Sequence, residues 1–307
     1  MAKPKIGVIG AGIMGENHIR ILSGLKDVSF AGFFDAKPER AAIISGKYSC
    51  KSFATLEDLL NQISFAVLAT PTSTHFELAS IILKKGIHLL VEKPLSLSYK
   101  KSLLLIDTAK RHKLFLSIGM IERFNPAITK LVSLLKNETV FGFDFKRFSP
   151  FPERIFDTSV IFDMMIHDLD LAVMLANSEL ESFRAQGVKS QSKFIDEANA
   201  TLYFKNGVIA KIESSRIKND KLRSLVVTTD KSIYDLNLIT KSLVKRSFET
   251  LTDKVSIDIV ARDQITSEIK DFLLSIAKNK PSISSAASTV YAQKIAEEVE
   301  NKICSYR

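Results

Sequence analysis

The sequence predicts an α/β protein of two domains, with a doubly wound parallel sheet in residues 1–120 and an α+β domain with an open, mostly antiparallel sheet in residues 121–307. The length of 307 residues suits two domains of ordinary size. Short β-branched or aromatic runs alternate with helical stretches up to about residue 120, as in parallel sheets with crossover helices. Beyond that point, strand-like runs follow one another directly.

Five strands are expected in the first domain, because five short apolar runs are bounded by turn residues or helical patterns. They cover residues 6–9, 29–34, 65–68, 88–92 and 114–118. The helix before the last strand contains Leu103 and Ile106. Ser96 or Ser98 is expected to cap it, because a hydroxyl can accept a hydrogen bond from an unpaired amide of the first turn.

The second domain begins with a strand-like run from residue 140 and a loop that contains Pro150 and Pro152, since proline cannot donate to a strand ladder. A helix at 159–175, strands at 198–204 and 208–214, and amphipathic helices at 265–277 and 286–303 follow. Asn206-Gly207 between the two strands predicts a type I′ hairpin turn. The open face of this sheet needs a cover, so a homodimer or homotetramer through the sheet is expected.

Composition and charge exclude several classes of protein. Hydrophobic residues make up 46% and charged residues 25%, which is ordinary for folded domains and excludes a disordered or fibrous chain. Lys and Arg number 43 against 34 Asp and Glu, a balance that first suggests a nucleic-acid partner. The basic residues are scattered, however, and the densest group, Lys110, Arg111 and Lys113, belongs to an expected amphipathic helix. A solvated surface that also attracts anionic small molecules is therefore favoured, with no nucleic acid bound.

Cysteines and apolar runs indicate the compartment. Cys50 and Cys304 form no Cys-x-x-Cys motif and have no histidine at metal-ligand spacing, so we expect free thiols, no metal and a reducing compartment. The longest apolar stretch, 171–176, is far shorter than the roughly 20 residues that span a bilayer. The first apolar run is too short for a signal peptide. We therefore expect a cytoplasmic protein without membrane association.

A glycine motif, Gly10-Ala11-Gly12-Ile13-Met14-Gly15, stands between the first strand and the following helix. In such a motif the first glycine permits a tight turn, the second lets the backbone approach a pyrophosphate, and the third lets the helix pack on the strand. Asp35 ends the second strand 20 residues later, where an acidic group binds ribose hydroxyls. A purely structural turn is the alternative. The context predicts a Rossmann dinucleotide-binding domain.

The same acidic residue favours NAD over NADP, because its charge repels the additional phosphate of NADP. Lys37 and Arg40 would soften that preference.

Lys93 follows the fourth strand in the sequence Val91-Glu92-Lys93-Pro94. Ligands of open α/β sheets bind at the carboxyl ends of the strands, so Lys93 is expected beside the nicotinamide. An ammonium group next to that positive charge loses its proton more easily, which suits proton exchange with a substrate hydroxyl. A surface lysine before a turn proline is the alternative.

Asp163 and His167 are four residues apart in an otherwise apolar helical stretch, so they share one helical face. A carboxylate beside an imidazole orients the ring and stabilises its protonated form, as a general base requires. A satisfied pair in the core is the alternative. A zinc site is not indicated, since a second imidazole or a thiolate is lacking.

With these residues in view, the chain resembles the Gfo/Idh/MocA oxidoreductases over almost its whole length. The resemblance implies a Rossmann domain, a C-terminal domain whose open sheet mediates dimers or tetramers, and NAD(P)-dependent oxidation or reduction of a sugar or polyol. It also implies that Lys93, Asp163 and His167 are the catalytic residues. The motifs that carry it are Gly10-x-Gly12-x-x-Gly15, Asp35, Ala69-Thr70-Pro71-x-x-x-His75, Glu92-Lys93-Pro94 and Asp163-x-x-x-His167-Asp168. The cofactor contacts that it implies are Gly10, Gly12, Ile13, Met14, Gly15, Asp35, Thr70, Pro71, His75 and Glu92.

Two stretches, 119–127 and 154–163, are similar to the branch of the family that includes UDP-N-acetylglucosamine 3-dehydrogenases. In that branch an aminotransferase converts the 3-keto product to a 3-amino sugar, and some relatives recycle a retained cofactor with 2-oxoglutarate. The glycines usual before the catalytic helix are replaced here by Thr158-Ser159-Val160-Ile161, which disfavours simple inositol or glucose oxidation.

The expected reaction removes a hydride from C3 of a nucleotide-activated hexose, while His167 or Lys93 takes the hydroxyl proton and Asp163 holds the imidazole. A guanidinium fork matches phosphate oxygens, although each arginine has an ordinary ion pair as its alternative. An inositol or free-sugar dehydrogenase and a non-catalytic NAD-binding sensor are the rival functions. The residues expected to contact the substrate are Arg123, Asn125, Arg147 and Arg154.

Overall fold

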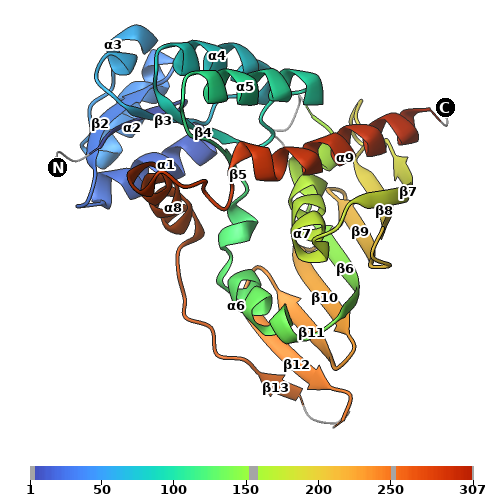
Figure 1. Ribbon diagram of the computed structural model, residues 1–307. Coiled ribbons are helices and arrows are strands. Elements are labelled where there is room, and N and C mark those ends of the chain that lie inside the picture. The colour runs from blue at the N-terminus through green and yellow to red at the C-terminus, as the bar shows by residue number, and fades with distance from the viewer. Residues whose placement is uncertain (1–3, 152–157, 250–253, 306–307) are drawn as a thin grey trace. The chain divides into compact units, whose positions relative to one another are not determined.

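The protein forms two compact units in a computed structural model that describes residues 4–151, 158–249 and 254–305 (Figure 1). The first unit contains Met1–Met120 and Ile265–Val290, and the second contains Ile121–Gln264 and Tyr291–Arg307. The sequence predicts that all of 121–307 belongs to the second domain. The structure differs, because the segment from residue 265 to 290 belongs to the first unit.

A five-stranded parallel sheet forms the centre of the first unit, in the order β2-β1-β3-β4-β5. The chain winds from β1 to β2 in one direction and from β3 to β5 in the other, so the order reverses between β1 and β3. Ligands bind at such a reversal in open α/β sheets. The strands are β1 (Lys5–Ile9), β2 (Ser29–Phe34), β3 (Phe65–Leu68), β4 (His88–Glu92) and β5 (Leu116–Gly119).

Helices connect these strands, and one cap differs from the expectation. Ser98 is the residue before α5, but its side chain accepts no capping hydrogen bond. The hydroxyl of Ser96 instead donates to the Ser98 carbonyl at 2.7 Å and lies 2.9 Å from the Ser102 hydroxyl. The connecting helices are α1 (Ile13–Gly24), α2 (Pro38–Tyr48), α3 (Leu56–Leu60), the 3₁₀ turn η1 (Thr72–Thr74), α4 (His75–Lys84) and α5 (Tyr99–Arg111).

A late helix, α8 (Gln264–Lys278), completes the core of this unit. Its Ile269 and Phe272 are fully buried, and the ring of Phe272 lies 4.8 Å from that of Phe65 on β3. The segment that follows α8 covers the edge of the sheet, because the Ile118 amide donates to the Ser284 carbonyl at 3.0 Å. Amphipathic periodicity predicts this helix but not the surface against which it packs.

An eight-stranded sheet forms the second unit, in the order β13-β12-β11-β10-β6-β9-β8-β7. Neighbouring strands are antiparallel except β6 and β9, which are parallel. The predicted fold class is therefore confirmed for both units. The strands are β6 (Val140–Phe148), β7 (Leu180–Val188), β8 (Glu197–Phe204), β9 (Ile209–Ser215), β10 (Leu222–Thr229), β11 (Ser232–Asn237), β12 (Ser242–Ser247) and β13 (Lys254–Ser256).

One face of this sheet is buried under helix α7 (Ile166–Ala176), which contacts β6 and β9 (Figure 1). Phe145, Ile212 and Leu225 are buried on that face, whereas alternate residues such as Lys146 and Lys211 are half-buried or exposed. Coverage of the second face by another subunit stays a prediction. The other helical segments are η2 (Ile121–Phe124), α6 (Pro126–Leu134), η3 (Leu135–Asn137), η4 (Ile161–Met165) and α9 (Ala286–Cys304), which begins in the first unit and continues into the second.

The β8–β9 hairpin corrects the predicted turn. Gly207 has a φ of +85°, but Asn206 is not among the residues with positive φ in the described chain, so the turn is not type I′. The Gly207 amide donates to the Phe204 carbonyl at 2.9 Å, which closes a three-residue loop with a glycine bulge. Asn206 instead donates from Nδ2 to the Ala176 carbonyl at 3.0 Å, a bond that ties the turn to the end of α7.

Two further expectations concern the chain at large. The loop proline Pro152 lies outside the described residues. Among the helices of the described residues, none has the length and apolar character needed to cross a membrane.

The packing of α8 predicts that Phe272→Ala destabilises the protein by about 3–5 kcal/mol, because a fully buried aromatic side chain leaves a cavity. Leu274→Ala on the same helix is the control, since Leu274 is 52% exposed. Urea denaturation followed by circular dichroism measures both. Equal stabilities of the two variants would contradict the assignment of α8 to the core of the first unit.

Candidate functional site

The glycine turn between β1 and α1 has a separate structural reason for each glycine. Gly10 has a φ of +91°, and a Cβ there would lie 2.6 Å from the Ala69 carbonyl oxygen. A Cβ at Gly15 would lie 1.9 Å from the Gly10 carbonyl oxygen, so the helix could not approach the turn. A Cβ at Gly12 would meet no atom within 4 Å. The fold therefore requires glycine at positions 10 and 15, whereas Gly12 leaves open space beside a pocket.

The first turn of α1 presents its amides at this space. Gly12 precedes the helix and no side chain caps it. The Glu16 amide, which donates to the Gly12 carbonyl at 2.7 Å, begins the helical hydrogen bonds. The amides of Ile13, Met14 and Gly15 therefore belong to the part of a helix that binds anions, where unpaired donors and the helix dipole coincide.

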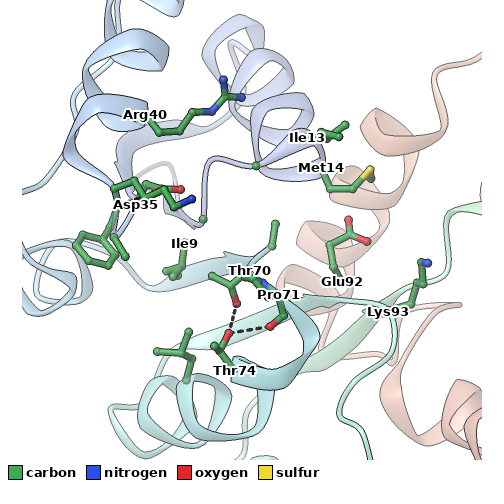
Figure 2. A pocket seen from close by; sticks show the side chains of 17 residues that line it. Ile9, Ile13, Met14, Asp35, Arg40, Thr70, Pro71, Thr74, Glu92 and Lys93 are labelled. Atoms are coloured by element: carbon green, nitrogen blue, oxygen red, sulfur yellow. Dashed lines mark hydrogen bonds between the residues drawn. The ribbon is translucent and has the colours of Figure 1, made fainter. Parts of the chain in front are cut away.

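A pocket of about 850 Å³ lies at the carboxyl ends of the first unit's strands, beside this turn (Figure 2). Its volume is within the range of small-molecule and cofactor sites. Gly15 and His75, two of the expected cofactor contacts, do not line it. The expected residues that do line it are Gly10, Gly12, Ile13, Met14, Asp35, Thr70, Pro71, Glu92 and Lys93, and the additional ones are Ile9, Phe34, Ala36, Lys37, Arg40, Ala69, Thr74 and Leu78.

Asp35 and Arg40 lie at one end of the pocket, as Figure 2 shows. Asp35 accepts the Ala11 amide at 2.6 Å on Oδ2 and the Lys37 amide at 2.8 Å on Oδ1. Each carboxylate oxygen has more than one lone pair, so Asp35 still has capacity to accept hydroxyl donors such as those of a ribose. Its negative charge disfavours an additional phosphate at this end.

Arg40 forms hydrogen bonds within the protein through two of its nitrogen atoms. Its Nε donates to the Ala11 carbonyl at 2.8 Å, and its Nη2 donates to Glu16 at 2.5 Å. A hydrogen bond from Lys47, together with those from Tyr48 and Arg40, lowers the pKa of Glu16 to about 2, so this carboxylate stays charged. These bonds commit part of the Arg40 guanidinium to the fold, which together with the charge of Asp35 fits NAD better than NADP.

Glu92 and Lys93 lie at the opposite end of the pocket in Figure 2, next to the carboxyl end of β4. His75 fixes the backbone there. Its Nδ1 lies 2.8 Å from the Pro94 carbonyl and its Nε2 lies 2.9 Å from the Thr70 carbonyl. Buried His75 holds two pocket-lining loops and does not itself line the pocket, so its contact with the cofactor stays a prediction.

Two buried titratable residues near Glu92, His18 and Glu268, are not predicted from the sequence. Glu92 Oε1 lies 2.8 Å from Nε2 of fully buried His18 on α1. Glu268 of α8 is also fully buried, and neither of its carboxyl oxygens has a hydrogen-bond partner in the described chain. Burial, and secondarily the charge of Glu92, raise the pKa of Glu268 well above its usual value. Nothing in the sequence distinguishes Glu268 from an exposed helical glutamate.

In the second unit, Asp163 and His167 lie where a π-helical turn, η4, meets α7. The sequence analysis predicted one continuous helix from 159. The wider π turn instead contains Asp163, and His167 stands in the first turn of the α-helix. Single π turns within helices are frequent at functional sites.

The start of this helix is held by a buried ion pair. Arg216 and Asp196 are both fully buried and lie 3.0 Å apart at Nε and Oδ1. Arg216 Nη1 also donates to the Thr158 carbonyl at 3.0 Å. The Val160 amide donates to the Ile195 carbonyl at 2.8 Å. The residues directly before β8 and directly after β9 therefore fix the segment that precedes Asp163.

Arg123 and Arg147 have internal partners, which differs from the expectation that they contact a diphosphate. Arg123 donates to both oxygens of Asp170 at 2.7 Å. Arg147 donates to Asp168 at 2.9 and 2.7 Å and to Glu122 at 3.0 Å. Their side chains are only 6% and 3% exposed, so the ordinary ion pair describes both.

Of the other two expected substrate contacts, only Asn125 lies within the described residues. Asn125 is fully buried. Its Oδ1 accepts the Ala127 amide at the start of α6 at 3.1 Å, and its Nδ2 donates to Glu122 at 3.0 Å. These bonds make Asn125 a structural residue. Arg154 lies outside the described residues.

Known proteins provide an independent comparison. A family model described as "Oxidoreductase family, NAD-binding Rossmann fold" matches residues 4–120, and a model of the GFO/IDH/MocA C-terminal domain matches residues 139–234. The UDP-N-acetylglucosamine 3-dehydrogenase of Acidithiobacillus ferrooxidans is 32% identical over 92% of this chain and 91% of its own length. The myo-inositol 2-dehydrogenase of Thermotoga maritima is 27% identical over 69% of this chain and 68% of its own.

Solved structures agree with these matches. The crystal structure of the UDP-N-acetylglucosamine 3-dehydrogenase GnnA from Acidithiobacillus ferrooxidans has a TM-score of 0.92 at 30% identity, and covers 99% of this chain and 98% of the other. An oxidoreductase from Agrobacterium radiobacter in complex with NAD⁺, L-tartaric acid and magnesium has a TM-score of 0.88 at 15% identity, with 100% and 98% covered. The second likeness concerns the fold alone.

The glycine turn predicts opposite effects for two similar substitutions. Gly12→Ala should leave the melting temperature nearly unchanged but weaken NAD binding about tenfold or more, because the methyl group enters the space left for the pyrophosphate. Gly15→Ala should destabilise the first unit, because its methyl group meets backbone. Thermal melts and NAD titrations measure both. Unimpaired NAD binding by Gly12→Ala would contradict this division of roles.

Buried Glu268 predicts a pH-dependent loss of stability. The native state keeps the proton that the unfolded chain releases above a pKa of about 4.3, so wild-type stability should fall as pH rises, by about 1.4 kcal/mol per pH unit, until the native group itself titrates. Glu268→Gln should therefore match wild type near pH 4 and exceed it at pH 7, in urea melts over that range. Exposed Glu77→Gln is the control, and an advantage of Glu268→Gln that does not grow with pH would refute the burial of a neutral acid.

Proposed function

The chain belongs to the GFO/IDH/MocA family of oxidoreductases with an NAD-binding Rossmann fold, and we propose that within this family it oxidises the C3 hydroxyl of UDP-N-acetylglucosamine or a similar nucleotide-activated sugar. The comparisons confirm three predictions from the sequence, namely the family, the class of dehydrogenase that acts on CH–OH groups, and the use of NAD. The sugar and the position oxidised are the proposal.

The similarity to UDP-N-acetylglucosamine 3-dehydrogenase carries the proposal, because it extends over both units at 32% identity. The similarity to inositol dehydrogenases is lower and spans less of the chain, at 27% over 69% and 28% over 75%. An inositol or free-sugar dehydrogenase is therefore the second candidate. The cofactor pocket of this chain suits either kind of dehydrogenase, so the substrate must be decided by experiment.

The residues of the pocket fit NAD. The amides at the start of α1 and the space beside Gly12 suit the pyrophosphate, and the Asp35 carboxylate suits the adenosine ribose. Glu92 and Lys93, at the other end of the pocket, would then adjoin the nicotinamide. When bound, NAD supplies a hydride acceptor.

Oxidation of a secondary alcohol to a ketone also requires a base for the hydroxyl proton. Lys93 and His167 are the proposed bases, and Asp163 is proposed to orient the imidazole of His167. The hydroxyl oxygen loses a proton and the carbon that bears this hydroxyl loses a hydride. The net charge of the sugar therefore does not change. A sensor that only binds NAD has no need of these three residues, which argues against that rival.

An assay with purified protein tests the proposal. NAD is mixed with UDP-N-acetylglucosamine, N-acetylglucosamine, or myo-inositol, each with and without 2-oxoglutarate as an acceptor that reoxidises retained NADH. NADH absorbance and mass spectrometry of the sugar follow the reaction. A 3-keto nucleotide sugar is expected. Oxidation of inositol but not of the nucleotide sugar would replace the proposal with the second candidate, and no product from any substrate would refute both.

Lys93→Met should lower turnover in the same assay by about 10²–10⁴-fold, the usual contribution of general acid–base catalysis. NAD titration should show that the variant still binds the cofactor. Lys100→Met, at an exposed position of α5, is the matched control and should keep wild-type turnover. Full activity of Lys93→Met would remove this residue from the chemistry.

A further inference from the structure

Besides Arg216, which holds the start of the helix that bears Asp163 and His167, the described part of the second unit has three arginines near this helix, and two of them are structural. Arg123 forms a two-bond ion pair with Asp170, and Arg147 forms one with Asp168 and a further bond with Glu122. Buried pairs of this kind leave a guanidinium no capacity for a ligand, because breaking one exposes an uncompensated charge inside the protein. An anionic substrate therefore needs another cation in this unit.

Arg223 is the third of these arginines. It stands on β10 directly opposite Arg147 of β6 in the antiparallel register, so both side chains lie on the same face of the sheet. In contrast to Arg147, the side chain of Arg223 is 48% exposed. Arg223 lies at the end of the buried face of the sheet. It therefore stands between solvent and the ion pairs that Arg147 forms with Asp168 and Glu122.

The bonding of Arg223 is incomplete. Its Nη1 lies 3.5 Å from Glu122 Oε1, an oxygen that already accepts a hydrogen bond from Arg147 at 3.0 Å. Within the described residues, the Arg223 side chain forms no hydrogen bond. A guanidinium carries five N–H donors in a planar fork that matches two phosphate oxygens at once. The donors of Arg223 are therefore available to a ligand that enters from solvent.

Burial and the surrounding charges act on Arg223 in opposite directions. Burial and the like charge of Arg147 lower the pKa of Arg223, while Glu122, Asp168 and Asp163 act in the opposite direction. Because Asp163 is among the charges that act on Arg223, the guanidinium lies near the catalytic segment. Repulsion from Arg147 is a cost that no hydrogen bond of Arg223 offsets within the described protein.

We propose that Arg223 binds the diphosphate of a nucleotide-activated sugar and so selects such substrates over uncharged sugars. This inference rests on the proposed function, which supplies the anionic substrate. Arg223 is not predicted from the sequence, since an arginine on an alternating strand has no local feature that separates it from a surface residue. Of Arg123, Arg147 and Arg223, only Arg223 is half-exposed and has donors without a hydrogen-bond partner in the described residues. The phosphate contact is therefore assigned to Arg223.

The test compares wild type, Arg223→Met and Arg223→Lys. Binding of UDP alone to the NADH-loaded protein is measured by calorimetry, and KM and kcat are measured with UDP-N-acetylglucosamine. Arg223→Met should weaken UDP binding and raise KM at least tenfold with kcat changed less than threefold, and Arg223→Lys should fall between it and wild type, because an ammonium keeps the charge but not the fork. Arg246→Met is the matched control, since Arg246 lies on β12 and pairs with Asp235.

The outcomes separate this inference from the proposed function. If wild type and Arg223→Met bind UDP equally while wild type oxidises UDP-N-acetylglucosamine, Arg223 is not the diphosphate ligand and the proposed function stands. If wild type neither binds UDP nor oxidises the nucleotide sugar, both are overturned. A fall in kcat with unchanged UDP binding and a shifted pH profile would show that Arg223 acts on the charge of Asp163 instead, and would overturn the inference.

Discussion

The close approach of helix α1 to the turn that follows β1 is the constraint on which the cofactor pocket depends. A single methyl group at Gly15 would fall 1.9 Å from the Gly10 carbonyl oxygen, so the helix begins as near to the sheet as backbone allows. This approach directs the first amides of α1 at the pocket. In the same turn, the Ala11 amide donates to Asp35 and the Ala11 carbonyl accepts a hydrogen bond from Arg40. These two bonds fix the end of the pocket that contains Asp35 and Arg40.

The second unit orders its helix by a different means, with charge in place of close backbone packing. Asp168 and Asp170 project from α7 to Arg147 and Arg123, and Arg216 with Asp196 fixes the residues before η4. Burying such pairs costs desolvation energy that their attraction only partly returns. In exchange the pairs are directional, since each bidentate contact permits only one orientation of the helix. Orientation is what Asp163 and His167 need if they are to act on one hydroxyl.

Sequence patterns predicted those features that neighbouring residues determine. Strands of the parallel sheet lie within a few residues of the expected bounds, and the glycine motif located the pocket, because both depend on local periodicity and turns. The differences between expectation and structure involve partners distant in the chain. Asn206 bonds to the end of α7, His75 bonds to two loops, and Arg123 and Arg147 find carboxylates on another element. Arg223 was missed for a related reason. It becomes distinctive only once Arg123 and Arg147 are seen to pair with carboxylates distant in the chain.

The return of α8 to the first unit has a consequence for biosynthesis. During translation, β1 to β5 leave the ribosome long before Ile269 and Phe272, which complete the hydrophobic cluster around Phe65. Until then the nascent chain exposes an apolar sheet face and the β5 edge that residues 282–285 later cover. Exposed surfaces of this kind are aggregation-prone and recruit chaperones. The first unit therefore finishes folding only after residues 265–290 have been made, although all five strands of its sheet lie before residue 120.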